Sequence, residues 1–156
     1  MTSATASSTL QAVPFSDFRI LIAEDNIVNQ KVLSRILNRL GADEVKIAGN
    51  GQIAVEMEAA EEFDFVLMDM QMPVMDGIEA CEVIQKRDDR PHPRAKVIFV
   101  TAHATTDYED DCLEAGAIDF LTKPCNLESV SRCFENVMRK LEAGDTRLFW
   151  EVQERN

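Results

Sequence analysis

The 156-residue sequence lacks any apolar run that approaches the roughly 20 residues needed for a membrane-spanning helix. Its first 17 residues contain no basic residue and no apolar stretch, so neither a secretory signal nor a transit peptide is visible. Basic residues are few, 16 against 28 acidic ones, and the net charge of −12 excludes tight, sequence-independent binding to nucleic acid. We therefore expect a cytoplasmic domain without nucleic-acid or membrane contacts.

Cysteine pairs are also lacking, although the sequence contains four cysteines. No two of them form a CxxC pair, and none has the spacing of a zinc site. We expect reduced side chains in the core or half-buried, as is usual in a cytosolic or nuclear protein. The four are Cys81, Cys112, Cys125 and Cys133.

What the sequence does contain is a regular alternation of short apolar segments and helical patterns. With 46% hydrophobic and 28% charged residues, the chain fits one globular domain. The expected strands cover residues 19–23, 44–48, 64–68, 96–100 and 117–121. The expected helices cover residues 32–40, 52–62, 77–87, 105–116 and 127–141. We expect a flexible lead-in at 1–17, the domain at 18–141 and a tail at 142–156.

Strands without polar alternation must be covered on both faces, which favours a parallel sheet with helices on both sides. Right-handed crossovers then give a doubly wound α/β domain. In such sheets ligands bind at the carboxyl ends of the strands, where the strand order reverses. If the order is 2-1-3-4-5, as in flavodoxin-like folds, the first and third strands are neighbours.

Chemically useful side chains follow the first, third, fourth and fifth expected strands. Glu24 and Asp25 follow the first, Asp69 the third, Thr101 the fourth and Lys123 the fifth. Two carboxylates about 4 Å apart repel each other by about 4 kcal/mol at an effective dielectric of about 20, so the cleft takes up a proton or a cation. Because these ligands are hard oxygens without histidine or thiolate, Mg²⁺ is the expected metal.

Taken singly, each residue has an ordinary structural explanation. An acidic residue after a strand often caps the next helix, and an isolated lysine usually lies on the surface. We expect Asp76, with Glu79 at capping-box spacing, to be such a cap, and Asn126 to cap the last helix. In combination, a metal, an ammonium group and a hydroxyl group suit phosphoryl transfer, with Asp69 as the nucleophile that forms an acyl phosphate.

Four segments, in order and at matching spacing, resemble the receiver domain of the response-regulator family of two-component signalling. They are AEDN at 23–26, MDMQMPVMDG at 68–77, VTA at 100–102 and LTKP at 121–124. The resemblance covers nearly all of the expected domain. It implies the strand order 2-1-3-4-5 and a switch controlled by phosphorylation.

The resemblance implies roles around the metal. Asp69 would be the phosphoacceptor and, together with Asp25, a ligand of Mg²⁺. Glu24 would act on the metal mostly through water, and the backbone carbonyl of Gln71 would be a further ligand. Gln71 and His103 stand at two positions that tune the lifetime of the acyl phosphate in the family.

The resemblance also implies a switch. Thr101 matches the hydroxyl that moves to a phosphoryl oxygen, and Lys123 matches the lysine that pairs with the phosphoryl group. The bond from Lys123 to Pro124 is cis in the family. Phe120 matches the aromatic switch residue, with phenylalanine where many members have tyrosine, so no phenol is present to form a hydrogen bond in the inward state.

Asn29 and Gln30 make the sequence more similar to the receivers of hybrid histidine kinases than to free-standing transcriptional regulators. The implied partner is a histidine kinase or a histidine-phosphotransfer domain that docks beside the site, at the first helix. Ile27 is the apolar residue expected at that contact, and the alternative is that its side chain packs inward.

Two other functions fit parts of the sequence. A phosphatase with an aspartyl intermediate would need a second Asp two residues after Asp69, where this sequence has Gln71. The segment GNGQIA at 49–54 has the G-x-G-x-x-A form of a dinucleotide fingerprint, but it follows the second strand. A tight glycine turn is the simpler explanation of that segment.

Overall fold

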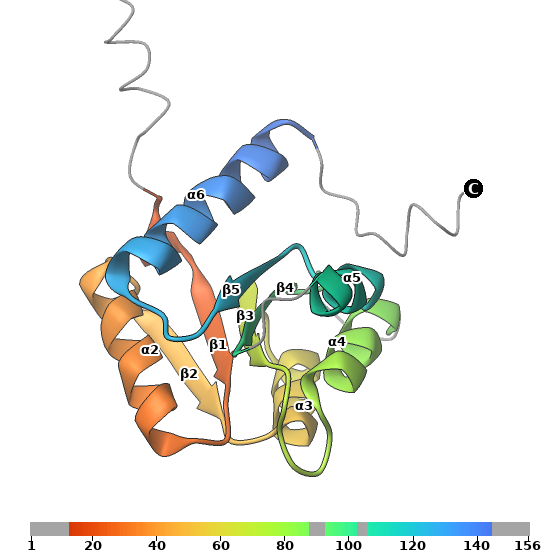
Figure 1. Ribbon diagram of the computed structural model, residues 1–156. Coiled ribbons are helices and arrows are strands. Elements are labelled where there is room, and N and C mark those ends of the chain that lie inside the picture. The colour runs from red at the N-terminus through yellow and green to blue at the C-terminus, as the bar shows by residue number, and fades with distance from the viewer. Residues whose placement is uncertain (1–12, 88–92, 103–105, 145–156) are drawn as a thin grey trace, which may run out of the picture.

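The computed structural model describes residues 13–87, 93–102 and 106–144. Within these ranges five strands alternate with five α-helices, as the sequence predicted (Figure 1). The strands are β1 (Arg19–Ala23), β2 (Glu44–Ala48), β3 (Phe65–Asp69), β4 (Lys96–Thr101) and β5 (Asp119–Thr122). A 3₁₀ turn, η1 (Phe15–Asp17), precedes the helices α2 (Ile27–Arg39), α3 (Gly51–Ala60), α4 (Gly77–Lys86), α5 (Thr106–Glu114) and α6 (Leu127–Glu142). None of these helices is both long and apolar enough to cross a membrane.

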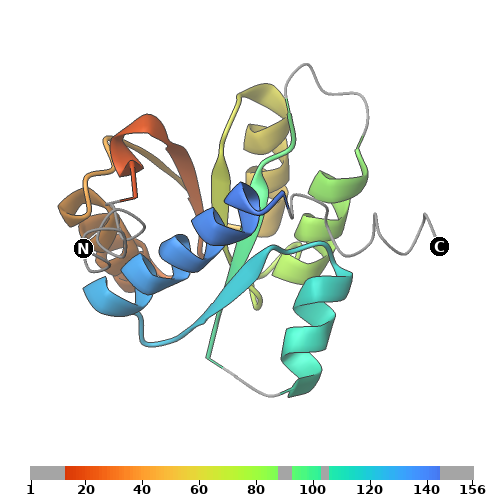
Figure 2. The same cartoon turned by 90° about the horizontal axis from the view of Figure 1, so that it is seen from above.

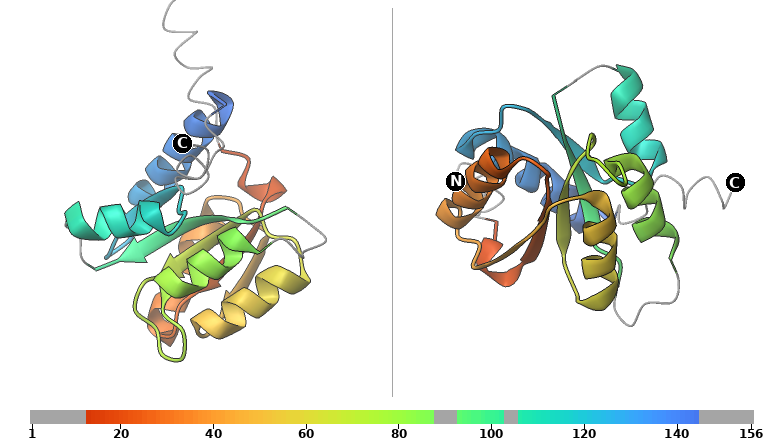
Figure 3. Two further views of the ribbon diagram at one scale, coloured as in Figure 1. Left: turned by 90° about the vertical axis from the view of Figure 1, so that its right-hand side faces the viewer. Right: turned by 90° about the horizontal axis from the view of Figure 1, so that it is seen from below.

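The sheet has the order β2-β1-β3-β4-β5, and every neighbouring pair is parallel, so the predicted fold is confirmed. Helices α2 and α6 cover one face, and α3, α4 and α5 cover the other (Figures 2 and 3). Because the strands are parallel, all of them end at the same edge of the sheet. We call this the carboxyl edge, and the opposite one the amino edge.

Successive side chains of the central strands enter different hydrophobic clusters, since the side chains of a strand alternate between its two faces. In β1, Ile20 and Ile22 pack on the side of α2 and α6, whereas Leu21 and Ala23 pack on the other side. The strands β1, β3 and β4 are therefore buried on both faces, which explains why their sequences show no polar alternation.

Strand β2 departs from this pattern because it is an outer strand of the sheet, with β1 as its only neighbour among the described strands. Only Ala48 of its five residues is buried, and Ile47 remains 41% exposed. Glu44 and Lys46 are exposed as well, and charged side chains are typical of an edge strand. The expectation that all five strands are covered on both faces is wrong for β2.

The packed structure begins before residue 18. Phe15 in η1 is 3% exposed, and its ring lies 4.9 Å from that of Phe134 in α6. Phe15, and Val13 in part, thus pack against the domain although both precede residue 18. Residues 1–12 lie outside the described part of the chain, and so does the end of the tail from residue 145.

The ends of the strands also shift slightly from their predicted positions. Asp69 and Thr101 are the last residues of β3 and β4 and do not follow these strands. Strand β5 begins at Asp119, two residues later than predicted, and the connection before it contains Gly116 with φ of 101°. The shifts leave the order of the elements unchanged.

Four helices begin at an Asn or Asp whose side chain accepts a hydrogen bond from the backbone three residues later. The predicted caps Asp76 and Asn126 are confirmed. Asn126 forms a full capping box, but with Ser129. Asp76 accepts from the backbone of Glu79 at 2.9 Å. These four helices start at the carboxyl edge. Because the Asn and Asp caps accept the hydrogen bonds of their first turns, the other polar side chains at this edge are not needed as helix caps.

Candidate phosphoacceptor site

Three carboxylates meet at the carboxyl edge, between the ends of β1 and β3. Each of Glu24, Asp25 and Asp69 has a carboxylate oxygen within 4.8 Å of those of the other two. The register aligns Ala23 of β1 with Met68 of β3, so Glu24, which follows β1, and Asp69, the last residue of β3, lie at the same level. Glu24 and Asp69 are buried, whereas Asp25 is exposed. The cluster is therefore open to solvent on the side of Asp25.

Neither of the first two carboxylates caps the helix, because the next residue does so; Glu24 Oε2 accepts a hydrogen bond from the backbone N–H of Asn26 at 3.1 Å. Asn26, and neither acidic residue, accepts the hydrogen bond from Asn29 N at 3.0 Å. The backbone of Glu24 is held in place because the side-chain amide of Gln30 donates a hydrogen bond to the Glu24 carbonyl oxygen at 2.6 Å. The sequence analysis used Gln30 only as a mark of a subfamily. Gln30 stands one helical turn after the Asn26 cap, and this spacing in the sequence was the signal that its side chain could reach the end of β1.

Lys123 is the cation of the site. Its Nζ lies 3.1 Å from Glu24 Oε1 and 3.4 Å from Asp69 Oδ1. Partial burial lowers the pKa of Lys123, but the hydrogen bond to Glu24 and the charge of Asp69 outweigh this effect and raise the pKa above its usual value. The ammonium group therefore stays protonated at neutral pH. One lysine faces three carboxylates, so the cluster keeps an excess of negative charge.

The loop between β5 and α6 aims this lysine at the cluster. The peptide bond between Lys123 and Pro124 is cis, as the family resemblance implied. The backbone N–H of Lys123 donates to the carbonyl oxygen of Thr101 at 2.6 Å, which ties the end of β5 to the end of β4. A cavity of about 300 Å³ beside the lysine is lined by Glu24, Val32 and Pro124, among others.

The loop of residues 70–76, between β3 and α4, forms the second wall of the site. The backbone N–H of Gln71 points back to Asp69 Oδ1 at 3.4 Å, while its side chain is exposed. The N–H of Gly77 donates to the carbonyl oxygen of Met70 at 2.9 Å and closes the base of the loop. A Cβ at Gly77 would lie 2.2 Å from the carbonyl oxygen of Asp69, so only glycine fits beside the strand end.

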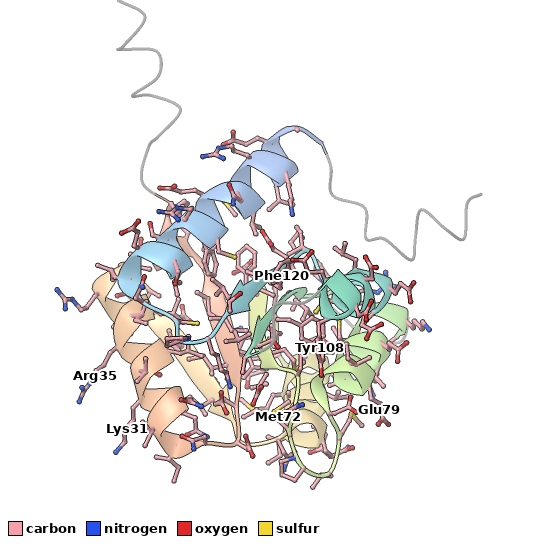
Figure 4. All side chains as sticks on the ribbon, viewed as in Figure 1. Lys31, Arg35, Met72, Glu79, Tyr108 and Phe120 are labelled. Atoms are coloured by element: carbon pink, nitrogen blue, oxygen red, sulfur yellow. The ribbon has the colours of Figure 1, made fainter. Side chains whose placement is uncertain are left out.

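The two expected switch residues lie next to this wall. The side chain of Thr101 is 4% exposed at the end of β4. Phe120 on β5 is half-buried. Like Tyr108 of α5, it packs against the hydrophobic cluster between the sheet and the helices α3, α4 and α5 (Figure 4). His103, the other residue expected to affect the acyl phosphate, lies outside the described part of the chain.

The four cysteines play no visible part in the site. All are free thiols, three of them buried and Cys125 half-buried, as the sequence predicted. Burial raises the pKa of each thiol, that of Cys112 to about 12, so they stay protonated at neutral pH.

The donor set fits a small, hard divalent cation. The cluster offers carboxylate oxygens only, and magnesium prefers a few such ligands together with water. Asp25 is open to solvent, which leaves room for water molecules and for a phosphoryl oxygen. Lys123 neutralises only part of the negative charge.

The fold and the site define a doubly wound α/β domain with an acidic carboxyl edge and a lysine beside it. The family model of the response regulator receiver domain matches residues 20–134. The chain therefore belongs to the response regulator receiver family, and this membership favours the receiver over the phosphatase and the dinucleotide-binding alternatives.

Curated relatives of this chain include histidine kinases. The peroxide stress-activated histidine kinase mak1 of Schizosaccharomyces pombe is 36% identical over 127 residues, which cover 79% of this chain and 8% of the relative. Hybrid signal transduction histidine kinase H of Dictyostelium discoideum is 41% identical, with 70% and 8% covered. The chain thus spans less than a tenth of the length of these two relatives.

Solved receiver domains have the same fold. The receiver of sensor histidine kinase PA1611 from Pseudomonas aeruginosa, crystallised with magnesium in its active-site cleft, is 34% identical with a TM-score of 0.66; the match covers 78% of this chain and 95% of that one. The receiver domain of Saccharomyces cerevisiae Ssk1, crystallised with the histidine phosphotransfer protein Ypd1, is 32% identical with a TM-score of 0.66, with 74% and 84% covered.

Proposed function

We propose that this chain is the phosphoacceptor domain of a phosphorelay, and that Asp69 takes a phosphoryl group from a phosphohistidine in the presence of Mg²⁺. The observation that carries the proposal is the meeting of three carboxylates and Lys123 at one edge of the sheet. The chain itself acts only in its own phosphorylation and dephosphorylation. The longer parent protein would be a cytoplasmic hybrid histidine kinase, or the cytoplasmic part of a membrane sensor kinase, like the relatives described above.

The chemistry is a displacement at phosphorus. A carboxylate oxygen of Asp69 attacks the phosphorus atom of the phosphohistidine. An O–P bond forms while the P–N bond to the donor imidazole breaks, so no further reactant is consumed. Lys123 Nζ, now 3.4 Å from Asp69 Oδ1, would pair with the transferred phosphoryl group. Mg²⁺ held by Asp25, Asp69 and the Gln71 carbonyl, with Glu24 behind a water molecule, would neutralise the phosphoryl oxygens.

The transferred group would act on Thr101 and Phe120. Thr101 ends β4 close to Lys123, since the Lys123 N–H donates to its carbonyl oxygen. Its hydroxyl would bond to a phosphoryl oxygen, and Phe120, which is only half-buried, would move with it. The face formed by β4, α5 and β5 would then carry the signal.

Helix α2 supports a protein partner beside the site. Ile27 and Val28 in its first turn are 64% and 66% exposed, so the alternative that Ile27 packs inward is wrong. Lys31 and Arg35 project from the same helix into solvent (Figure 4). The helix contains basic residues but no acidic one, in a chain of net charge −12. A histidine kinase or histidine-phosphotransfer domain with an apolar, acid-rimmed surface fits this face.

Two measurements test the proposal. Incubation with acetyl phosphate and Mg²⁺ should add one phosphoryl group, which maps to the peptide that contains Asp69. Ile27→Asp should slow transfer from a phosphorylated histidine-phosphotransfer protein by at least about tenfold, since it buries a charge in an apolar contact. It should leave the reaction with acetyl phosphate unchanged. Leu113→Asp, at an apolar side chain on α5 that is 37% exposed, is the control. Equal rates for both variants would contradict the docking site.

A further inference from the structure

The segment GNGQIA is unexplained by the proposed function, and the structure shows that its two glycines differ. Neither adopts a positive φ, unlike Gly41, Gly116 and Gly144, so a tight glycine turn is not what requires them. A Cβ at Gly49 would have no atom within 4 Å. A Cβ at Gly51 would lie 2.2 Å from the carbonyl oxygen of Met75 and 2.9 Å from its carbonyl carbon.

The contact at Gly51 joins two distant parts of the carboxyl edge. Gly51 is the first residue of α3, and Met75 lies in the loop of residues 70–76 that leaves the phosphoacceptor strand. Figures 1 and 3 show this loop beside the start of α3. Because the opposing atoms belong to the backbone, a side chain at position 51 could be accommodated only if the loop or the helix moved.

The loop itself is strained at this point. Val74, directly before Met75, has φ of 73°, a conformation that costs a β-branched residue about 1–2 kcal/mol. Its side chain is 80% exposed, so contacts of the side chain do not compensate for the strain. The loop must therefore be held by its neighbours, and two backbone contacts lie at or beside its C-terminal end. Gly77 closes the base, and the start of α3 packs against the tip at Met75.

We propose that the start of α3 is a backstop for the phosphoacceptor loop and that Gly51 is a positioning residue for the phosphorylation of Asp69. The proposal rests on the function proposed above. A methyl group at position 51 pushes Met75 away, and the displacement is passed along the loop to the Gln71 carbonyl, four positions earlier, and to Asp69, six positions earlier. These are the oxygens that must keep their geometry for Mg²⁺ and for the phosphoryl group.

Gly51→Ala and Gly49→Ala form a matched pair, since both add one methyl group to the same segment. Magnesium binding is measured by calorimetry, well below the unfolding temperature, and phosphorylation by acetyl phosphate is followed by mass. Gly51→Ala should weaken magnesium binding and slow phosphorylation by about tenfold or more, because misplacement by about 1 Å has effects of that size. Gly49→Ala should match the unchanged protein in both. A folded Gly51→Ala protein with normal magnesium affinity would overturn the proposal.

A milder variant covers the case in which Gly51→Ala does not fold. The side chain of Asn50 accepts a hydrogen bond from Ile53 N at 2.8 Å and so fixes the first turn of α3. Asn50→Ala loosens this turn, whereas Asn50→Ser restores the cap. Weaker magnesium binding in Asn50→Ala that Asn50→Ser recovers supports the backstop, and equal affinities refute it. Failure of the unchanged protein to bind magnesium would instead refute the proposed function.

Discussion

The two edges of the sheet carry similar charged groups in opposite arrangements. At the amino edge, Arg19 serves several acceptors at once: its side chain lies 3.0 Å from Glu44, 2.8 Å from Glu61 and 2.7 Å from the Glu62 carbonyl oxygen. Lys46 adds a second cation 2.8 Å from Glu61. At the carboxyl edge, Glu24 and Asp69 share the ammonium group of Lys123, and Asp25 is the third carboxylate of the cluster.

The difference separates a structural cluster from a site. At the amino edge the cations pair with the carboxylates, and these pairs are partly exposed, so solvent screening leaves each of them a small contribution to stability. At the carboxyl edge the negative charge exceeds the positive charge, and Glu24 is only 1% exposed. An imbalance of this kind favours a site that takes up a further partner, and the function proposed above supplies a cation and a phosphoryl group.

The largest expected difference between the edges is chemical. Asp64 directly precedes β3, and Asp69 is the last residue of the same strand. At the amino edge, Asp64 accepts a hydrogen bond from the backbone N–H of Arg19. Asp69→Asn should abolish phosphorylation by acetyl phosphate, because an amide oxygen cannot form a stable acyl phosphate. Asp64→Asn should leave the yield unchanged. Intact-mass measurements decide, and a phosphoryl group retained in Asp69→Asn would move the site elsewhere.

The next difference concerns stability. Lys123→Ala leaves the buried carboxylate of Glu24 without its cation, so the free energy of unfolding without metal should fall by about 2–3 kcal/mol. Lys46→Ala breaks an exposed pair and should reduce it by less than about 1 kcal/mol. Chemical denaturation of both variants in a metal-free buffer provides the comparison. Equal losses would show that the two edges do not differ in burial of charge.

Magnesium should stabilise the protein by binding at the carboxyl edge and not at the amino edge. At a free concentration ten times its dissociation constant, Mg²⁺ should raise the free energy of unfolding by about 1.4 kcal/mol. Asp25→Asn should remove most of this gain, since it removes the exposed carboxylate of the cluster. Glu61→Gln, at the amino edge, should keep the gain in full. Thermal unfolding with and without Mg²⁺ tests the prediction, and a gain that survives Asp25→Asn would argue against this ligand.

The smallest expected effect is the dependence of stability on pH. Hydrogen bonding to Lys46 holds the pKa of Glu61 below its ordinary value of 4.5, so this contribution is present above pH 4.5 and is lost as the pH falls through the lowered pKa. The raised pKa of Lys123 acts in the opposite direction. Its contribution is present below pH 10.5 and is lost as the pH rises through the raised value.

Variants at the two edges should therefore be separated by the alkaline arm of the pH–stability profile. Glu61→Gln should flatten the acidic arm and leave the alkaline arm unchanged, whereas Lys123→Ala should flatten the alkaline arm. Denaturation midpoints across the pH range measure both arms. A change in the alkaline arm upon Glu61→Gln would contradict the assignment of that arm to Lys123.

Much of the site was predictable because it depends on local pattern. Apolar runs of about five residues mark strands, and their ends position Glu24, Asp25, Asp69, Thr101 and Lys123 at one edge once the strands are parallel. The caps at Asp76 and Asn126 followed from spacing in the same way. The error at β2 arose because coverage on both faces was expected of all five strands, although the expected order 2-1-3-4-5 already places the second strand at the edge, where charged side chains such as Glu44 and Lys46 remain exposed.

Other features could not be read from the sequence because they depend on contacts between distant segments. The burial of Phe15 requires Phe134, more than a hundred residues away, and the exposure of Ile27 depends on which side of α2 meets the sheet. The requirement for glycine at position 51 comes from a single backbone oxygen of Met75.

By itself, then, the sequence determined which chemical groups stand at the ends of the strands, because strand length and helix capping are set by neighbouring residues. Only the tertiary structure decided how those groups are balanced and held. The ratio of cations to carboxylates at each edge, and the close approach of α3 to the phosphoacceptor loop, exist only after separate segments have packed together.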